Sequence, residues 1–193
     1  MTGRLSLLRR SGTSSRGVPY LIRPALETDA VDIVALHDAV AAEGIHIAGV
    51  PGDRSVLEES LNLAGILNGG GLSLVLEIEG RVAGNVIVQR FQTRYHRHLG
   101  ELAIIVAGPH RRTGLGRTLM NTAIEWAITV RLAKLCLNVF PTNVAAVALY
   151  RGLGFEEEGL RRNQVLMPDG YRDVLAMGLL LPGATRDGGR RSP

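Results

Sequence analysis

The stretch that decides the fold is Glu101–Met120, which reads ELAIIVAGPHRRTGLGRTLM. An apolar strand ends at Val106, a short basic turn follows, and Gly114 and Gly116 then precede a helical pattern. Glycine lets a ligand oxygen come close to main-chain nitrogen and tolerates a positive φ. The first turn of a helix offers unpaired N–H groups to an anion. The stretch therefore predicts a phosphate-binding connection, and we name residues 107–116 the phosphate turn.

Arginine side chains surround this turn and would add charge-assisted hydrogen bonds to a phosphate: they are Arg111, Arg112 and Arg117. A plain strand-to-helix connection that needs glycine only to turn is the alternative. The order of strand, arginines and amphipathic helix favours phosphate binding. Two common phosphate motifs do not fit, because the one lysine, Lys134, lies elsewhere and Leu119 stands where GxGxxG needs its third glycine.

Two blocks of sequence resemble the GNAT superfamily of N-acetyltransferases. Residues 111–116, RRTGLG, match its R/Q-x-x-G-x-G/A signature, and residues 143–155, NVAAVALYRGLGF, resemble its N-x-x-A-x-x-x-Y-x-x-x-G-F segment. The resemblance covers about residues 20–181. It implies an α/β fold with a GNAT-like mixed, mostly antiparallel central sheet flanked by helices. Gly108–Pro109 departs from the pattern, because members usually place the proline one residue earlier.

The resemblance also implies acetyl-CoA as co-substrate, without a metal, and a set of cofactor-binding residues. These are Ile104, Ile105 and Val106 along the pantetheine arm; Arg111, Arg112, Thr113, Gly114, Leu115, Gly116, Arg117 and Thr118 around the pyrophosphate; and Asn143, Ala146 and Tyr150 near the sulfur. The small alanines beside Asn143 would let the pantetheine arm approach the helix closely.

Two residues are the candidate catalytic groups. The resemblance makes Tyr150 a general acid, and a phenol with a pKa of about 10 is protonated at neutral pH and able to protonate a departing thiolate. Packing beside Phe155 is the alternative role. Glu101 is the candidate base for the amine, through a water molecule. A solvated carboxylate at a strand end explains Glu101 equally well.

The expected reaction moves an acetyl group from acetyl-CoA to a primary amine. Residues 171–173, YRD, resemble members that act on free amino acids or small amines, so we place a small-molecule acceptor first. A polyamine or a protein N-terminus is an alternative acceptor, and succinyl is an alternative acyl group. A polyamine needs an acidic pocket, whereas residues 43–46 supply one carboxylate. A non-catalytic acyl-CoA-binding regulatory module is the competing class of protein.

The positive charge of the chain lies in its ends. The net charge is +4, and residues 1–18 hold four arginines and no acid, while residues 182–193 hold three arginines and one acid. The remaining body is nearly neutral, so the charge does not support nucleic-acid binding. We expect a disordered leader at 1–18, a single acetyltransferase domain at 19–181 and a flexible tail at 182–193.

The single cysteine, Cys136, rules out an internal disulfide and fits a reducing compartment. Apolar runs stay below the ~18 residues that a membrane helix needs. We therefore expect a cytoplasmic protein without a membrane partner, and a homodimer is left open.

Hydrophobic periodicity and turn residues place the elements. Strands are expected at 20–23, 72–78, 82–91, 99–106 and 135–140, a hairpin at 155–167 with 171–181, and helices at 27–42, 53–67, 114–130 and 143–151. Asp53 is expected to cap the second helix, and Thr142 or Asn143 the last.

Overall fold

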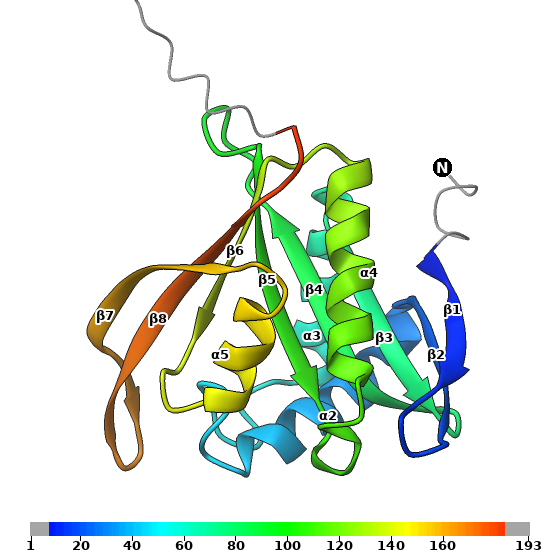
Figure 1. Ribbon diagram of the computed structural model, residues 1–193. Helices are drawn as coiled ribbons and strands as arrows, with labels where there is room; N and C mark the ends of the chain where they lie inside the picture. Colours follow the sequence, from blue (N-terminus) through cyan, green and yellow to red (C-terminus); the bar gives the residue numbers. More distant parts are fainter. Residues whose placement is uncertain (1–7, 184–193) are drawn as a thin grey trace, which may run out of the picture.

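The computed structural model describes residues 8–183, which form one sheet with helices on both faces (Figure 1). The strands are β1 (Arg10–Thr13), β2 (Pro19–Pro24), β3 (Leu72–Ile78), β4 (Arg81–Arg90), β5 (Leu99–Val106), β6 (Lys134–Val139), β7 (Glu156–Met167) and β8 (Gly170–Leu180). Their order in the sheet is β1-β2-β3-β4-β5-β6-β8-β7. All neighbouring pairs are antiparallel except β5 and β6, which are parallel. The predicted mixed, mostly antiparallel sheet is therefore confirmed.

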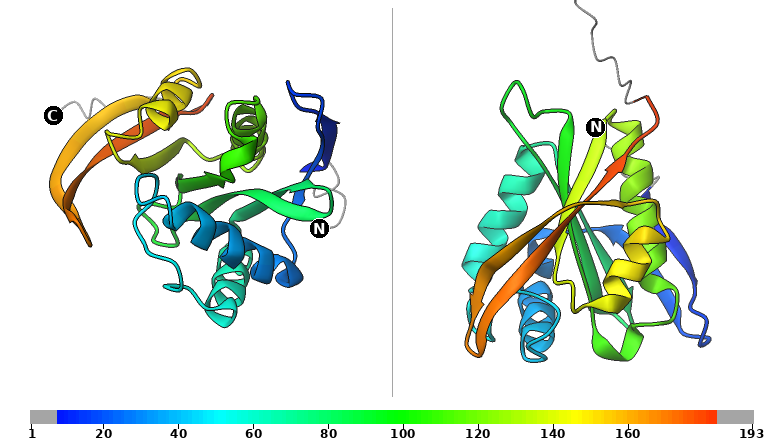
Figure 2. Two further views of the ribbon diagram at one scale, coloured as in Figure 1. Left: turned by 90° about the horizontal axis from the view of Figure 1, so that it is seen from below. Right: turned by 60° about the vertical axis from the view of Figure 1, so that its left-hand side comes forward.

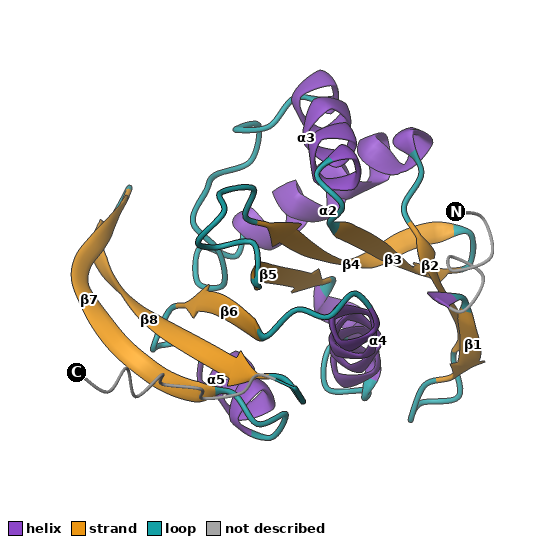
Figure 3. Cartoon of the chain, turned by 90° about the horizontal axis from the view of Figure 1, so that it is seen from above, coloured by secondary structure: helices purple, strands orange, loops and turns teal. Residues whose placement is uncertain are grey.

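Helices cover both faces of this sheet. They are α2 (Ala30–Ala41), α3 (Val56–Asn68), α4 (Leu115–Thr129) and α5 (Val144–Arg151), with short 3-10 turns η2 (Glu27–Asp29) and η3 (Gly108–His110). Helices α2 and α3 lie on one face, and α4 and α5 lie on the other (Figures 2 and 3). The larger core lies under α4, which buries Leu119, Met120 and Ala123 completely. A smaller cluster that includes Ile33, Leu63 and Val75 packs on the opposite face.

The parallel pair β5–β6 is joined over only part of its length. The pairing register runs from Leu99↔Lys134 to Glu101↔Cys136, although β5 continues to Val106 and β6 to Val139. The two strands therefore diverge after Glu101. At the closed end a Cβ on Gly100 would stand 2.7 Å from Cγ1 of Val88, so only glycine fits there. The opening between the strands is where the candidate site lies.

Two expectations about the N-terminal half are wrong. Residues 10–13, placed in a disordered leader, form β1 and pair antiparallel with β2. The segment after β1 also contacts the phosphate turn, since the N–H of Ser15 donates to the carbonyl of Thr113 over 3.2 Å. Helix α3 is capped by Ser55 and not by Asp53, whose carboxylate accepts a hydrogen bond from the N–H of Val50. Residues 1–7 and 184–193 of the expected leader and tail lie outside the described residues.

Candidate active site

The phosphate turn has the backbone that its glycine pattern predicts. Gly114 is the N-cap of α4 with a φ of 85°, and Arg112 has a φ of 60°. A Cβ on Gly114 would meet nothing within 4 Å, so the space in front of this helix terminus is open. The buried Thr113 hydroxyl donates to the carbonyl of His110 over 2.6 Å and fixes the turn. The chain at the start of α4 thus has open space beside Gly114.

The three arginines of this region lie in different surroundings. Arg111 donates to the carbonyl of Val106 over 2.7 Å and forms a two-pronged ion pair with Glu43, at 2.6 and 2.8 Å. The same contact lowers the pKa of Glu43. Arg117 donates to the carbonyl of Gly152 over 3.0 Å, while Arg112 is exposed. Arg111 therefore ties the end of β5 to the segment after α2, a role that the motif does not predict.

A cavity of about 630 Å³ occupies the opening between β5 and β6. On the face of α4 and α5 it is lined by the phosphate turn and by α5. On the opposite face it is lined by α2 and the segment that follows α2. The expected site residues that line it are Ile104, Ile105, Val106, Arg111, Arg112, Gly116, Asn143, Ala146 and Tyr150. The expected residues that do not line it are Glu101, Thr113, Gly114, Leu115, Arg117 and Thr118. The cavity thus connects the two faces of the sheet.

Helix α5 presents its expected residues to the cavity. Asn143 caps the helix, and its side chain accepts a hydrogen bond from the N–H of Ala146 over 3.2 Å. Tyr150 follows two turns later, lines the cavity and is only 7% exposed. Its ring packs at a tilt against Phe155, with 6.0 Å between the ring centres. Burial raises the pKa of Tyr150 to about 12, so its hydroxyl keeps its proton at neutral pH.

Glu101 sits at the closed end of the opening and does not line the cavity. Its carboxylate accepts a hydrogen bond from the side-chain amide of Asn138 over 3.0 Å. Asn138 does line the cavity, and its side-chain oxygen Oδ1 accepts a hydrogen bond from Arg161 over 3.3 Å. Asn138 therefore links Glu101 to the cavity.

Five polar residues of the cavity are not among the expected site residues: His37, His46, Arg54, Asn85 and Asn138. His37 lies on α2 among the buried residues Ile33, Leu36 and Val40, and this spacing is that of one helix face. A histidine on an otherwise apolar face was the available signal. His46 and Arg54 lie in the glycine-containing segment between α2 and α3, where no periodicity marks them.

Across residues 8–183, the helices are too short or too polar to span a bilayer. The same part of the chain contains no cluster of three His, Cys, Asp or Glu side chains suited to a metal ion.

Comparison with known proteins defines the class. Residues 45–155 match the model of the acetyltransferase (GNAT) family, so the chain belongs to this family. Spermidine N(1)-acetyltransferase of Vibrio cholerae is 35% identical over 95 residues, which are 49% of this chain and 55% of that protein. The [ribosomal protein bS18]-alanine N-acetyltransferase of Escherichia coli K12 is 41% identical over 76 residues, 39% of this chain and 51% of that protein.

The chain spans about half the length of the curated relatives that it matches. Likeness to a solved structure extends further. The crystal structure of a GNAT-family acetyltransferase from Streptococcus pneumoniae is 31% identical and superposes with a TM-score of 0.77, over 84% of this chain and 99% of that one. The fold of most of the chain therefore follows the architecture of the family.

Proposed function

We propose that the protein transfers an acetyl group from acetyl-CoA to a primary amine. The observation that carries this proposal is the cavity between β5 and β6, which has a phosphate turn and a buried tyrosine on one face and opens to the other face. A thioester and an amine that enter from opposite faces would meet there. Holding two reactants together removes much of the entropic barrier to their reaction.

The cofactor has a matching surface on one face of the sheet. Pairing of β5 with β6 ends at Glu101, so the later edge of β5 is available to the amides of the pantetheine arm in the manner of an added strand. The N–H groups at the start of α4 and the exposed Arg112 would bind the pyrophosphate. Arg111 would act by holding the turn in place through Glu43.

Tyr150 is the proposed general acid. Attack of the amine on the thioester carbonyl gives a tetrahedral intermediate, and its collapse breaks the C–S bond and leaves the electron pair on sulfur. A buried phenol with a pKa of about 12 remains protonated and can give its proton to that sulfur. Because Tyr150 is present, we favour an enzyme over a non-catalytic acyl-CoA-binding module.

The acceptor is proposed to be a small molecule such as a free amino acid. Cavity residues of the described chain include Arg54, Arg111, Arg112, His37 and His46 but neither aspartate nor glutamate. A polyamine binds best where carboxylates surround its ammonium groups, so this lining disfavours it. A protein N-terminus is the second candidate, because the [ribosomal protein bS18]-alanine N-acetyltransferase is among the relatives.

The test is release of free thiol from acetyl-CoA by the purified protein in the presence of single amines. The panel contains free amino acids, spermidine and peptides with a free N-terminus. We expect the fastest release with an amino acid and slow release with spermidine. A folded preparation that releases no thiol with any of the three classes would overturn the proposed function, and preference for spermidine would overturn the acceptor class.

A further inference from the structure

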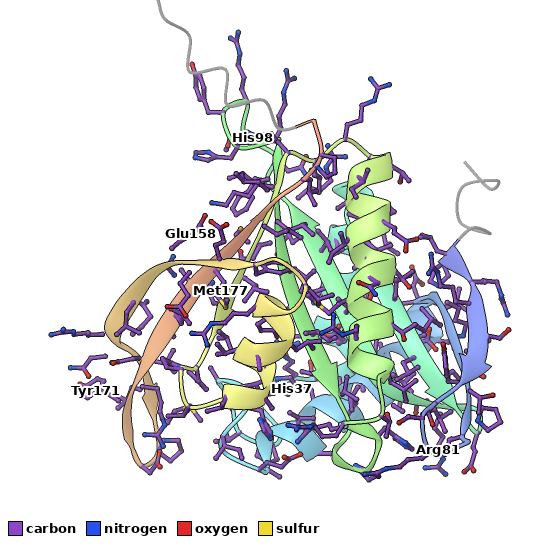
Figure 4. The ribbon with its side chains drawn as sticks, viewed as in Figure 1. His37, Arg81, His98, Glu158, Tyr171 and Met177 are labelled. Atoms are coloured by element: carbon purple, nitrogen blue, oxygen red, sulfur yellow. The ribbon has the colours of Figure 1, made fainter. Side chains whose placement is uncertain are left out.

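His37 is a buried histidine whose surroundings set it apart from the other residues of the cavity. His37, labelled in Figure 4, lies on α2, on the face of the sheet opposite α5, and it lines the same cavity as Tyr150. Only 4% of the residue is exposed. A titratable side chain is thus held on the side from which the acceptor would enter.

The hydrogen bonding of His37 is incomplete. Its Nδ1 is a buried polar atom without a hydrogen-bond partner in the described chain. The nearest carboxylate oxygen, Oδ1 of Asp38, is 3.9 Å away and accepts instead from the N–H of Gly52. An unpartnered buried polar atom lowers stability. Buried polar atoms that lower stability in this way are common at functional sites.

The other ring nitrogen lies beside Gly49. A Cβ on Gly49 would stand 3.3 Å from Cε1 and 3.7 Å from Nε2 of His37, so a side chain at position 49 would cover this edge of the ring. Carboxylates lie on both sides of the ring: Asp38 is 3.9 Å from Nδ1, and Asp53 lies beside Gly49. With the proton on Nδ1, the lone pair lies on Nε2, at the edge of the ring beside Gly49.

The charged groups around His37 come from its own helix and from the segment before α3. Burial and the charge of Arg54 lower the pKa of His37, against the opposing effects of Asp38 and Asp53. The pKa therefore lies below the usual value of about 6.5. The imidazole is neutral at pH 7 and able to accept a proton.

We propose that His37 is the catalytic base that takes the proton from the acceptor nitrogen. This inference rests on the proposed function. The neutral amine attacks the thioester carbonyl carbon, its lone pair forms the C–N bond, and Nε2 of His37 takes one proton from the nitrogen. As the carbonyl reforms, the C–S electron pair leaves on sulfur, which takes the Tyr150 proton. The imidazolium proton then returns to the phenolate through solvent, so amine and acetyl-CoA give amide and CoA.

Glu101 is the competing base, and its geometry is less suitable. Its carboxylate is bonded to Asn138 and does not line the cavity, whereas His37 does. Replacement of the two residues in turn therefore separates the alternatives. His96, an exposed residue between β4 and β5, is the matched control for loss of a histidine.

The experiment measures kcat/KM against pH for the wild type and for His37→Gln, Glu101→Gln and His96→Gln. As the pH falls below the His37 pKa, both the substrate amine and the imidazole of the wild type become protonated. The plot of log kcat/KM against pH should then fall with a slope of about two. In His37→Gln the slope should stay at about one and kcat should fall about a hundredfold, with acetyl-CoA affinity unchanged. Glu101→Gln and His96→Gln should keep the wild-type profile.

A wild-type profile in His37→Gln, or loss of the second slope in Glu101→Gln, would overturn the assignment. If His37→Gln does not fold, NMR titration of the wild-type histidines replaces it. The lower break of the wild-type rate profile must then coincide with the pKa of the His37 signal, and a different value would refute the proposal. Failure of the proposed function is distinct, because the wild type itself would then release no thiol with any amine.

Discussion

Tyr150 packs its ring against Phe155 and lines the cavity, so the packing role and the proposed acid role can be separated by removing one oxygen atom. Tyr150→Phe keeps the contact with Phe155 and removes the proton donor. We expect kcat to fall about a hundredfold while the Kd for acetyl-CoA stays unchanged, because general acids contribute factors of about this size. Initial rates and calorimetry measure the two quantities. An unchanged rate would remove Tyr150 from the mechanism.

Gly114 offers a second test at the scale of one residue. Its φ of 85° strains any side chain, so Gly114→Ala should lower the free energy of unfolding by about 1–2 kcal/mol. Gly80 has a φ of 75° and similar open space, and it lies in the turn between β3 and β4. Gly80→Ala is therefore the matched control.

Both variants should lose similar stability in urea titrations, but only Gly114→Ala should bind acetyl-CoA more weakly. Equal affinities in the two variants would contradict the assignment of the phosphate turn.

Sequence predicts single residues well where their role is local. The positive φ of Gly114 and the cap at Asn143 follow from short motifs, and the structure has both. The ion pair between Arg111 and Glu43 joins residues that are 68 positions apart in the chain, so no local sequence pattern predicts it. His37 was missed for a related reason, because its importance depends on what faces it across the cavity.

At the scale of elements, α5 carries Tyr150 and depends on its cap. Asn143→Ala removes the hydrogen bond to the N–H of Ala146 and should destabilise the protein by about 1 kcal/mol. The start of α5 should also loosen, so kcat should fall. Ser55→Ala removes the equivalent cap of α3, which lies away from the cofactor face, and serves as control.

Thermal unfolding should show that Asn143→Ala and Ser55→Ala lose similar amounts of stability. Turnover should fall only in Asn143→Ala. A comparable loss of turnover in Ser55→Ala would mean that general stability, and not the position of α5, limits activity.

Most element boundaries could be read from the sequence because they depend on local patterns. The hairpin of β7 and β8 follows from its Pro-Asp-Gly turn, and α4 follows from its apolar face. Strand β1, RSGT, has no alternating apolar residues, so its sequence alone predicts disordered chain. Its place is set by pairing with β2, which is tertiary information. The cap of α3 was misplaced because Asp53 and Ser55 are both good capping residues.

At the scale of the whole molecule, the ion pair of Arg23 with Asp29 joins β2 to η2, at 2.7 and 2.8 Å. Burial raises the pKa of Asp29, but hydrogen bonds from Arg23 and the N–H of Leu26 outweigh burial, and the net pKa is lowered. The folded state therefore binds this proton more weakly than the unfolded chain. The stabilisation is present above about pH 3.9 and is lost as the pH falls toward the folded-state pKa.

Asp29→Asn should lower the free energy of unfolding at pH 7 by roughly 3 kcal/mol and make its fall in acid shallower. Asp169→Asn, which breaks the exposed pair with Arg172, should change stability by less than about 1 kcal/mol. Urea titrations between pH 3 and pH 7 provide the measurement, and equal effects of the two substitutions would contradict this account of Asp29.

The order of the eight strands was not predicted from the sequence, and the family resemblance indicated only a mixed, mostly antiparallel sheet. Periodicity shows that strands exist, but not which strands are neighbours, because pairing joins residues far apart in the chain. The cavity was still less accessible, since it depends on where β5 and β6 stop pairing. The phosphate turn and Tyr150 could be named in advance, and the acceptor side could not.

The central claim is that the opening between β5 and β6 receives acetyl-CoA against the phosphate turn. Titration calorimetry of acetyl-CoA with the wild-type protein tests it most directly. The account predicts saturable binding of acetyl-CoA that is weakened in Gly114→Ala and unchanged in Gly80→Ala. A folded wild-type protein that gives no binding heat with millimolar acetyl-CoA at several temperatures would contradict it.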